Sequence, residues 1–235
     1  MEHKVLVWIP VMNEGKTVKN IVNEITETYP EWDILVVDDD SNDNTVEEVK
    51  KTKAKLVQIP INTKGNGTAI VAFLIAEKSN YDFLLKIDGD GQQEVKSLEK
   101  LLQPLKNKEA DISVGSRYIT KVKETDSFLK VIGRSVSSSL INFKLKGKNH
   151  ITDVTSGLRG WNAQSIKIFQ KIYSTRPLPN NSTFWIVEDI IATKKNLTIK
   201  EVPTFYSKRK YGKSKSFSPL NMAFFVFRLL HILII

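Results

Sequence analysis

The sequence predicts an α/β fold in which a mostly parallel sheet is covered by helices. Apolar runs bounded by turn residues alternate with segments of helical periodicity through most of the 235 residues, which is typical of parallel strands joined by crossover helices. The chain is 41% hydrophobic and has no Gly- or Pro-rich linker, so one domain can bury a full core. We therefore expect a single domain over residues 1–219, followed by an apolar helix at residues 220–235.

The elements follow one another in a regular order through the first half of the chain. Residues 5–9 are expected to form a buried strand, and apolar residues at helical spacing between positions 18 and 25 mark the helix that follows. Further strands are predicted at residues 34–37, 56–59, 83–87 and 112–114, with helices at 68–76 and 98–105. In the second half, a helix is expected around residues 128–145, an irregular stretch up to Trp161, a helix at 186–195 and a strand at 198–202.

Polar side chains cluster where three of the predicted strands end. The clusters are Asn13-Glu14, Asp38-Asp39-Asp40 and Asp88-Gly89-Asp90. In open α/β sheets, ligands bind outside the carboxyl ends of the strands, so we expect the three clusters to converge on one crevice.

The third cluster is a candidate metal site. Asp88 and Asp90 stand two residues apart directly after an apolar strand, and the glycines beside them let the backbone approach a ligand. Mg²⁺ and Mn²⁺ usually take one or two protein carboxylates and fill the other positions with phosphate oxygens and water. The pattern favours a site for a nucleotide diphosphate, while an ordinary Asp/Gly turn stays open as the alternative.

The second cluster sets three acids side by side, and their repulsion must be offset by hydrogen-bonding or cationic partners. Recognition of a nucleotide accounts for this cost, because Asp side chains accept hydrogen bonds from a base N–H or from ribose hydroxyls. Asp43 and Asn44, which follow the cluster, are assigned instead to a turn and a helix cap.

Several motifs, taken in order, make the chain resemble the family 2 glycosyltransferases of GT-A fold. They are Pro10-x-x-Asn13-Glu14, Val37-Asp38-Asp39-x-Ser41, Asp88-x-Asp90-x-Gln92 and Gly115-Ser116-Arg117-Tyr118. Three more segments resemble the dolichyl-phosphate mannosyltransferase subgroup and its bacterial relatives that glycosylate polyprenyl phosphate. They are Lys64-Gly65-Asn66-Gly67-Thr68-Ala69, Asp153-x-x-Ser156-Gly157-x-Arg159, and Glu201-Val202-Pro203 followed by Arg209-x-x-Gly212-x-Ser214-Lys215.

The resemblance covers about residues 4–216 and implies a Rossmann-like GT-A domain that transfers a sugar with inversion. The donor would be a nucleotide-diphosphate sugar and the acceptor a dolichyl or undecaprenyl phosphate. Asp40 stands where the family more often has Gly, and Gly89 where it commonly has Ala. These departures leave the identity of the sugar open.

The resemblance also implies roles for individual residues. Asp90 would bind Mg²⁺ or Mn²⁺ together with Asp88 and Gln92, while Arg117 and Arg134 would meet the acceptor phosphate. Asp153 would orient the acceptor or its counter-charges, and it would be the first candidate for a general base if the acceptor were a hydroxyl. The residues expected to contact the donor are Pro10, Asn13, Glu14, Val37, Asp38, Asp39, Lys64, Gly67, Asp88, Gly89, Arg209 and Lys215.

Charge and hydropathy point to a membrane surface. The net charge of +9 favours anionic partners, and the absence of cysteine excludes a disulfide framework or a thiolate zinc site. Residues 222–235 are nearly all apolar, yet a helix of that length reaches about 21 Å, short of the roughly 30 Å hydrocarbon core. We expect it to lie in the interface as an amphipathic helix, to begin a transmembrane segment, or to pair with a membrane partner subunit.

From these features we expect the chain on the cytoplasmic face of a membrane, either peripheral or anchored at its carboxyl end, and the first ten residues show no signal-peptide pattern. Two alternatives stay open. One is a family 2 transferase that extends a glycan at a sugar hydroxyl. The other is a non-catalytic basic protein that binds membranes or nucleic acid, but this alternative leaves the acids at three strand ends unexplained. We expect no nucleic-acid partner, because the sequence shows no pattern that interleaves basic and aromatic residues.

Overall fold

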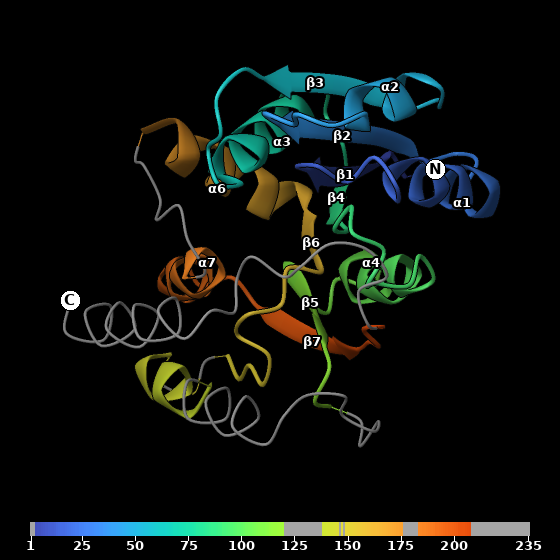
Figure 1. The fold of residues 1–235 in the computed structure, drawn as a ribbon. Helices are drawn as coiled ribbons and strands as arrows, with labels where there is room; N and C mark the ends of the chain where they lie inside the picture. Colours follow the sequence, from blue (N-terminus) through green and yellow to red (C-terminus); the bar gives the residue numbers. More distant parts are fainter. Residues whose placement is uncertain (1–2, 120–137, 146, 148, 176–182, 208–235) are drawn as a thin grey trace.

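A computed structural model of the chain describes residues 3–119, 138–145, 147, 149–175 and 183–207. Within these residues, the centre of the molecule is a seven-stranded sheet with the order β3-β2-β1-β4-β6-β5-β7 (Figure 1). All neighbouring strands pair in parallel except β6, which runs antiparallel to both β4 and β5. The strands are β1 (Val5–Val11), β2 (Asp33–Asp39), β3 (Lys55–Ile59), β4 (Phe83–Lys86), β5 (Ile112–Ser116), β6 (Arg159–Asn162) and β7 (Ile199–Pro203).

Helices cover both faces of the sheet, because the side chains of each central strand alternate between two apolar layers. Leu6 and Trp8 of β1 belong to one layer, and Val7 and Ile9 to the other. The first layer is completed by α3 (Asn66–Lys78), α6 (Ala163–Thr175) and α7 (Phe184–Lys194). The second is completed by α1 (Val18–Thr28), α2 (Thr45–Lys50) and α4 (Ser97–Lys106).

The predicted mostly parallel α/β sheet is confirmed, but β6 and α6 were not predicted. The sequence of β6, Arg-Gly-Trp-Asn, lacks the apolar pattern of the other strands. Its Gly160 lies so close to its neighbours that a Cβ there would meet Ser113 Oγ at 2.6 Å and Leu85 Cδ2 at 2.8 Å. Helix α6 did leave a signal, since Ile166, Phe169 and Tyr173 are buried at helical spacing.

Two expectations fall partly or wholly outside the described residues. The helix expected around residues 128–145 is helical over residues 138–144, and its earlier part is not described. The apolar helix at residues 220–235, and with it the domain boundary at residue 219, also lies outside. None of the described helices combines the length and the hydropathy needed to cross a membrane.

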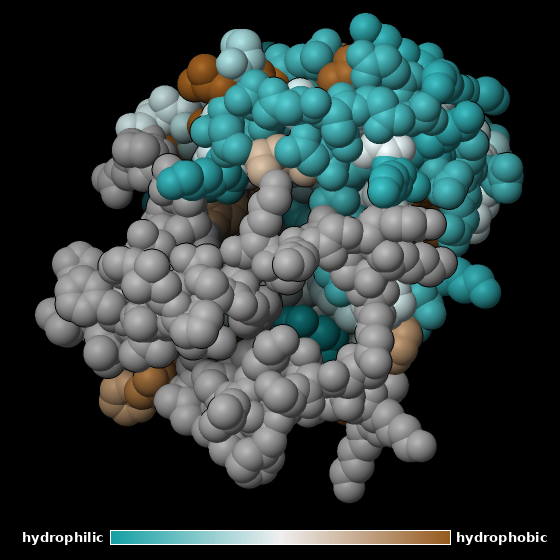
Figure 2. Space-filling view, viewed as in Figure 1, coloured by the Kyte–Doolittle hydropathy of each residue, from teal (hydrophilic) through white to brown (hydrophobic). Residues whose placement is uncertain are grey.

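The surface formed by α1, α2 and β3 is largely hydrophilic in the view of Figure 2, with hydrophobic side chains as isolated spots. Large apolar side chains that are exposed include Phe143 at 86% and Ile61 at 67%. The polar residues of interest for function gather instead at the carboxyl ends of the strands.

Candidate active site

Hydrogen bonds join the loops that follow β1, β2 and β4. The backbone N–H of Asn13 donates to Ser41 Oγ at 2.8 Å, and the side-chain oxygen of Asn13 accepts from the N–H of Asn42 at 2.7 Å. Thr17 Oγ1 donates to the carbonyl oxygen of Gly89 at 2.6 Å. The three polar clusters therefore lie together at one end of the strands, as their positions in the sequence predicted.

Asp43 organises the contact between the first two loops. It accepts from the N–H of Thr45 at 2.9 Å and from the N–H of Gly15 at 3.2 Å, while the N–H of Glu14 donates to Thr45 Oγ1 at 2.9 Å. Desolvation acts to raise the pKa of Asp43, but the hydrogen bonds from Thr45 and Gly15 outweigh it and hold the pKa below its usual range. This local role agrees with the assignment of Asp43 to a turn before a helix.

Asp39 holds the loop that carries two of the predicted donor-binding residues, Lys64 and Gly67. The carboxylate, 3% exposed, accepts from the N–H of Thr63 at 2.9 Å and from the N–H of Gly65 at 2.8 Å. The N–H of Gly67 in turn donates to Thr63 Oγ1 at 2.9 Å. Asp39 therefore acts through the backbone of this loop, which it holds in place.

Asp38, Val37 and Pro10 lie beside this loop at the ends of β1 and β2. Asp38 is 2% exposed and accepts a hydrogen bond from the hydroxyl of Ser41. Pro10 and Val37 are register partners, and Pro10 is partly exposed while the Val37 side chain is buried in the core. Of these residues, Pro10 is the one that is not buried.

The third cluster rests on a buried lysine that the sequence analysis did not single out. Lys86 is the last residue of β4, and its ammonium group donates to the carboxylate of Asp88 and, at 2.9 Å, to the carbonyl oxygen of Gly157. The same group lies 5.6 Å and 5.2 Å from the ring centres of Trp8 and Trp185. The burial of this cation is thus matched by an anion, a carbonyl dipole and two aromatic faces.

The other carboxylate oxygen of Asp88 is held by Gln93. Gln93 Nε2 donates to Asp88 Oδ2 at 2.7 Å and to the hydroxyl of Tyr206 at 2.9 Å, and Gln93 Oε1 accepts from the N–H of Asp88 at 2.7 Å. With a lysine on one oxygen and an amide on the other, Asp88 already has protein partners on both.

Asp90 and Gln92 are the residues of this turn that fit a metal ion. Among the described residues, no group of three or more His, Cys, Asp or Glu side chains is placed to hold a metal, so an all-protein cage is not present there. Asp90 is partly exposed and accepts from the N–H of Gln92 at 3.0 Å, and Gln92 Nε2 donates to the carbonyl oxygen of Ser207 at 3.1 Å. A partly open carboxylate with a neighbouring amide suits an ion that takes its other ligands from phosphate and water.

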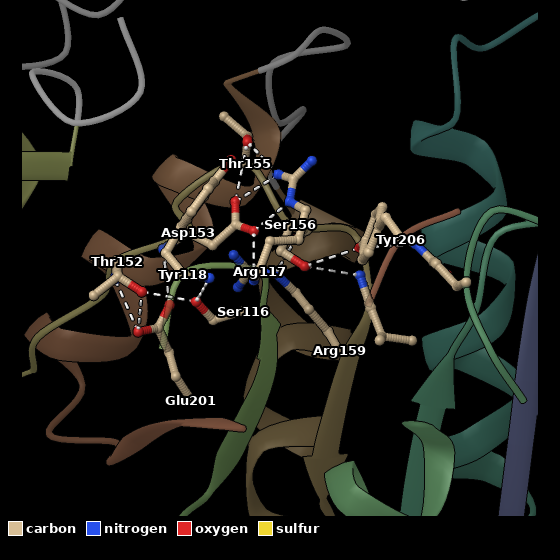
Figure 3. Close-up of polar contacts among 12 residues, drawn as sticks. Ser116, Arg117, Tyr118, Thr152, Asp153, Thr155, Ser156, Arg159, Glu201 and Tyr206 are labelled. Carbon is tan, nitrogen blue, oxygen red and sulfur yellow. Dashed lines mark hydrogen bonds and ion pairs between the residues drawn. The ribbon is translucent and has the colours of Figure 1, made fainter. Parts of the chain in front are cut away.

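Arg117 and Asp153 form a bidentate ion pair at the end of β5 (Figure 3). Arg117 Nε and an Nη donate to the two oxygens of Asp153 at 2.6 and 2.7 Å, and the same Nη donates to Thr155 Oγ1 at 3.2 Å. The Asp153 side chain is 1% exposed and that of Arg117 is 21% exposed. Burial acts to lower the pKa of Arg117, but Asp153 outweighs it and the pKa is raised. Arg117 therefore stays protonated within the pair, and part of its side chain reaches solvent.

A second carboxylate supports this pair from behind. Glu201 accepts from the N–H of Asp153 at 2.8 Å and from the N–H of Thr152 at 2.9 Å. Burial raises the pKa of Glu201, hydrogen bonds from Thr152 and Asp153 oppose the shift, and the charge of Asp153 adds to it. The motif that contains Glu201 predicted no role for this residue, and the structure shows that it fixes the backbone that carries Asp153.

A fully buried ionic cluster lies on β6 and α7. Arg159 donates to both oxygens of Asp189 at 2.5 and 3.0 Å, Trp161 Nε1 donates to Glu188 at 3.1 Å, and the hydroxyl of Tyr173 donates to the other oxygen of Glu188. Burial raises the pKa of Glu188 to about 7 against the opposing effects of Arg159 and Tyr173. Glu188 is therefore a core residue.

The structure brings together most of the predicted site residues but does not cover all of them. Arg134, Arg209 and Lys215 lie outside the described residues, so their roles stay predictions. Lys86, Gln93 and Tyr206 were not predicted to belong to the site. Of these, Lys86 left a signal, since a lysine within an apolar strand directly before an acidic turn calls for an anionic partner.

Comparison with known proteins identifies the family of this chain and relatives whose function is named. The family described as Glycosyl transferase family 2 matches residues 6–167, more than half of the chain. The chain is 30% identical over 215 residues to the "UDP-N-acetylglucosamine--dolichyl-phosphate N-acetylglucosaminyltransferase" of Methanococcus voltae, covering 83% of this chain and 82% of that protein. It is 28% identical over 220 residues to the "Undecaprenyl-phosphate mannosyltransferase" of Micrococcus luteus, covering 90% of this chain and 87% of that protein.

A solved structure shares the fold. Glucosyl-3-phosphoglycerate synthase from Mycobacterium tuberculosis, crystallised with Mn²⁺, uridine diphosphate and glucosyl-3-phosphoglycerate, matches with a TM-score of 0.69. The match covers 98% of this chain and 80% of that protein at 15% sequence identity. At this identity the likeness is one of fold, and it agrees with the α/β architecture that the sequence predicted.

Proposed function

Since the chain belongs to glycosyl transferase family 2, we propose that it transfers a sugar from a nucleotide-diphosphate sugar to the phosphate of a polyprenyl phosphate. The two relatives named above act, by their names, on dolichyl phosphate and undecaprenyl phosphate. Within the site, the proposal is carried by one observation. The guanidinium group of Arg117 lies against the ring of Tyr206. The hydroxyl of Tyr206 accepts a hydrogen bond from Gln93, and the same amide group of Gln93 donates to Asp88.

The acceptor side of the proposal follows from the chemistry of a phosphate nucleophile. A phosphomonoester has its second pKa near 6, so its oxygens are largely ionised at neutral pH and need no strong base. Arg117 would bind this acceptor phosphate, and Arg134 is proposed to assist it. The attack would come from the face opposite the departing diphosphate and would invert the anomeric carbon.

Asp153 supports this acceptor better than a hydroxyl acceptor. Its two oxygens are occupied by Arg117, at 2.6 and 2.7 Å, and its side chain is 1% exposed. Both oxygens of Asp153 are therefore engaged with a guanidinium group rather than turned to a substrate hydroxyl. We therefore assign Asp153 the orientation of Arg117, and the glycan-extending alternative would require this ion pair to open.

The donor side is assigned to the loops after β1, β2 and β4. Asn13, Glu14 and Pro10 would line one wall, and the loop of Lys64 and Gly67, which Asp39 fixes, would line another. When bound, Mg²⁺ or Mn²⁺ would neutralise charge on the departing diphosphate, and Asp90 with Gln92 would hold it. Asp88 would act beside them as an orienting carboxylate, and Arg209 and Lys215 are proposed to close over the diphosphate.

The acceptor is a lipid, so we propose that the protein works on the cytoplasmic face of a membrane. The net charge of +9 would favour an anionic leaflet, where each nearby cation contributes about 1 kcal/mol. Sedimentation with anionic vesicles tests this. Vesicle binding that does not depend on anionic lipid would contradict the proposed electrostatic attachment.

The function is tested by a donor screen on the purified full chain. UDP- and GDP-sugars are offered with Mn²⁺ and a short polyprenyl phosphate, and products are analysed by mass and by mild acid treatment. A glycosyl phosphate, which mild acid cleaves, supports the proposal. An acid-resistant glycoside formed on a sugar hydroxyl would favour the alternative acceptor instead.

A further inference from the structure

Tyr206 touches both halves of the proposed active site with two different parts of one side chain. Its hydroxyl accepts a hydrogen bond from Gln93 Nε2 at 2.9 Å. The same hydroxyl lies 3.1 Å from Ser156 Oγ (Figure 3). Its ring lies beneath a cation, with the Cζ of Arg117 4.7 Å from the ring centre. The hydroxyl therefore belongs to the donor side and the ring to the acceptor side.

The hydroxyl is one hydrogen bond away from the support of Asp88. Gln93 Nε2 has two hydrogens, and it uses one for Asp88 Oδ2 at 2.7 Å and the other for Tyr206. Gln93 is 6% exposed, so water does not readily replace a lost partner. A displacement of Tyr206 would thus loosen the amide that orients the Asp88 carboxylate.

The ring limits the movement of the acceptor cation. Arg117 is held by Asp153 through two hydrogen bonds, and the guanidinium plane also lies near the aromatic faces of Tyr206 and Tyr118, at 4.7 and 5.5 Å. A guanidinium group over an aromatic ring is attracted to its face. The phenol ring is rigid, so its hydroxyl and its face keep a fixed spacing.

The backbone at Tyr206 is also fastened to the acidic turn. Tyr206 forms a β-bridge with Gln93, and the next residue, Ser207, donates its N–H to the carbonyl oxygen of Gln92 at 2.7 Å. Gln92 Nε2 returns a bond to the carbonyl oxygen of Ser207 at 3.1 Å. The position of the Tyr206 ring is therefore set by the turn that carries Asp88 and Asp90.

We infer that Tyr206 is a positioning residue that holds the turn of Asp88 to Gln92, on the donor side, at a fixed spacing from Arg117, on the acceptor side. The inference rests on the proposed function, because that function makes Arg117 an acceptor site. Its two contacts are chemically separable. Tyr206→Phe removes the hydroxyl and keeps the ring, whereas Tyr206→Leu removes both.

The experiment compares these two variants with wild type and with Tyr29→Phe, a matched loss of a hydroxyl at a ring that stacks on Trp32 at 3.9 Å. Transfer kinetics give kcat and both KM values, and calorimetry gives the affinity for UDP and for GDP with Mn²⁺. We expect Tyr206→Phe to raise the donor KM by about threefold to tenfold, the ratio that one hydrogen bond between uncharged groups supplies, and to change the acceptor KM by less than about twofold. Tyr206→Leu should raise both the donor KM and the acceptor KM, and Tyr29→Phe should raise neither of them.

The possible outcomes separate this inference from the proposed function. Unchanged KM values in both variants, or a fall in kcat that merely follows a lower melting temperature, would mean that Tyr206 only packs. A wild-type protein that binds UDP or GDP with Mn²⁺ but transfers no sugar to polyprenyl phosphate would overturn the function and the acceptor half. The donor half would then be decided by the nucleotide affinity of Tyr206→Phe. A wild-type protein that binds neither nucleotide would overturn both.

Discussion

Lys86 is paired with Asp88 across the boundary between the core and the active site. The Lys86 side chain is 5% exposed and that of Asp88 is 37% exposed. The cation of the pair is therefore buried, and its carboxylate is in contact with solvent. Gly157 permits this arrangement, since a Cβ there would lie 3.0 Å from the ammonium nitrogen and 3.3 Å from Asp88 Oδ2. The charge of Asp88 is thus matched within the protein, beside a site proposed to receive a diphosphate.

Replacing Lys86 by Met should affect both stability and donor binding. Removal of the cation leaves Asp88 without its ionic partner, which in a fully buried pair costs about 3–5 kcal/mol. Because Asp88 stays in contact with solvent, we expect a smaller loss of about 1–3 kcal/mol in the free energy of unfolding. The unmatched carboxylate should also repel the diphosphate and raise the donor KM.

Denaturant unfolding and donor kinetics check this prediction. Lys55→Met is the matched control, because Lys55 is exposed and lies 3.9 Å from Asp33, and its loss should change stability by less than about 0.5 kcal/mol. A Lys86→Met variant as stable as the control would show that the buried pair contributes little.

The sequence revealed the position of the acidic groups but not the partners that hold them. Asp38, Asp39 and Asp88 could be located because each follows an apolar strand, and parallel strands end at the same side of a sheet. The carbonyl partner of Lys86 comes from Gly157, 71 residues away, and no local pattern encodes such a contact. Tyr206 likewise reaches Gln93 from 113 residues away.

Strand β6 was not predicted for the same reason, because its partners lie far away in the sequence. β6 is placed between β4 and β5 by tertiary packing, and its residue Arg159 is fully buried against Asp189 of α7. A charged residue at a strand's start argues against a central strand when read locally. Its burial becomes favourable only when the acidic partner on a later helix is in place.

Asp90→Asn should nearly abolish transfer. The proposed metal site has few protein ligands, so removing one anionic oxygen is expected to lower kcat/KM by about a hundredfold or more, equivalent to several kcal/mol. Glu94→Gln is the control, since Glu94 is exposed and lies four residues further along the chain. Activity measured over a Mn²⁺ titration decides the matter: wild-type activity of Asp90→Asn at saturating Mn²⁺ would remove Asp90 from the metal site.

Arg117→Ala should weaken acceptor use, but it should also destabilise the fold. It leaves Asp153, which is 1% exposed, as an unpaired buried charge next to Glu201, at an expected cost of about 3–5 kcal/mol. The double variant Arg117→Ala/Asp153→Asn removes that charge. We expect it to recover most of the stability while the acceptor KM stays high and the affinity for nucleotide stays near that of wild type.

Thermal unfolding and separate KM measurements test the Arg117 prediction. Recovery of the acceptor KM together with stability in the double variant would show that Arg117 acts only on the fold. A loss of nucleotide affinity large enough to explain the whole loss of rate would reassign Arg117 to the donor. Arg134→Ala, at a position outside the described residues, is expected to raise the acceptor KM in the same way.

Glu188 should make stability depend on pH near neutrality. Burial raises its pKa from 4.5 to about 7, Arg159 and Tyr173 oppose the shift, and the charge of Asp189 adds to it. The folded state therefore holds a proton that the unfolded state releases above about pH 4.5. The stabilisation from this group is fully present below that pH and is lost as the pH rises through about 7.

The test compares the free energy of unfolding between about pH 5 and pH 8 in wild type, Glu188→Gln and the surface control Glu94→Gln. Wild type and the control should lose stability as the pH rises toward about 7, because the unfolded state has already released the Glu188 proton that the folded state still holds. Glu188→Gln cannot release it, so its profile should be flatter, and the amide can still accept from Trp161 Nε1 as the carboxylate does at 3.1 Å. Parallel profiles for wild type and Glu188→Gln would mean that Glu188 does not titrate in this range and that Arg159 keeps both Glu188 and Asp189 ionised.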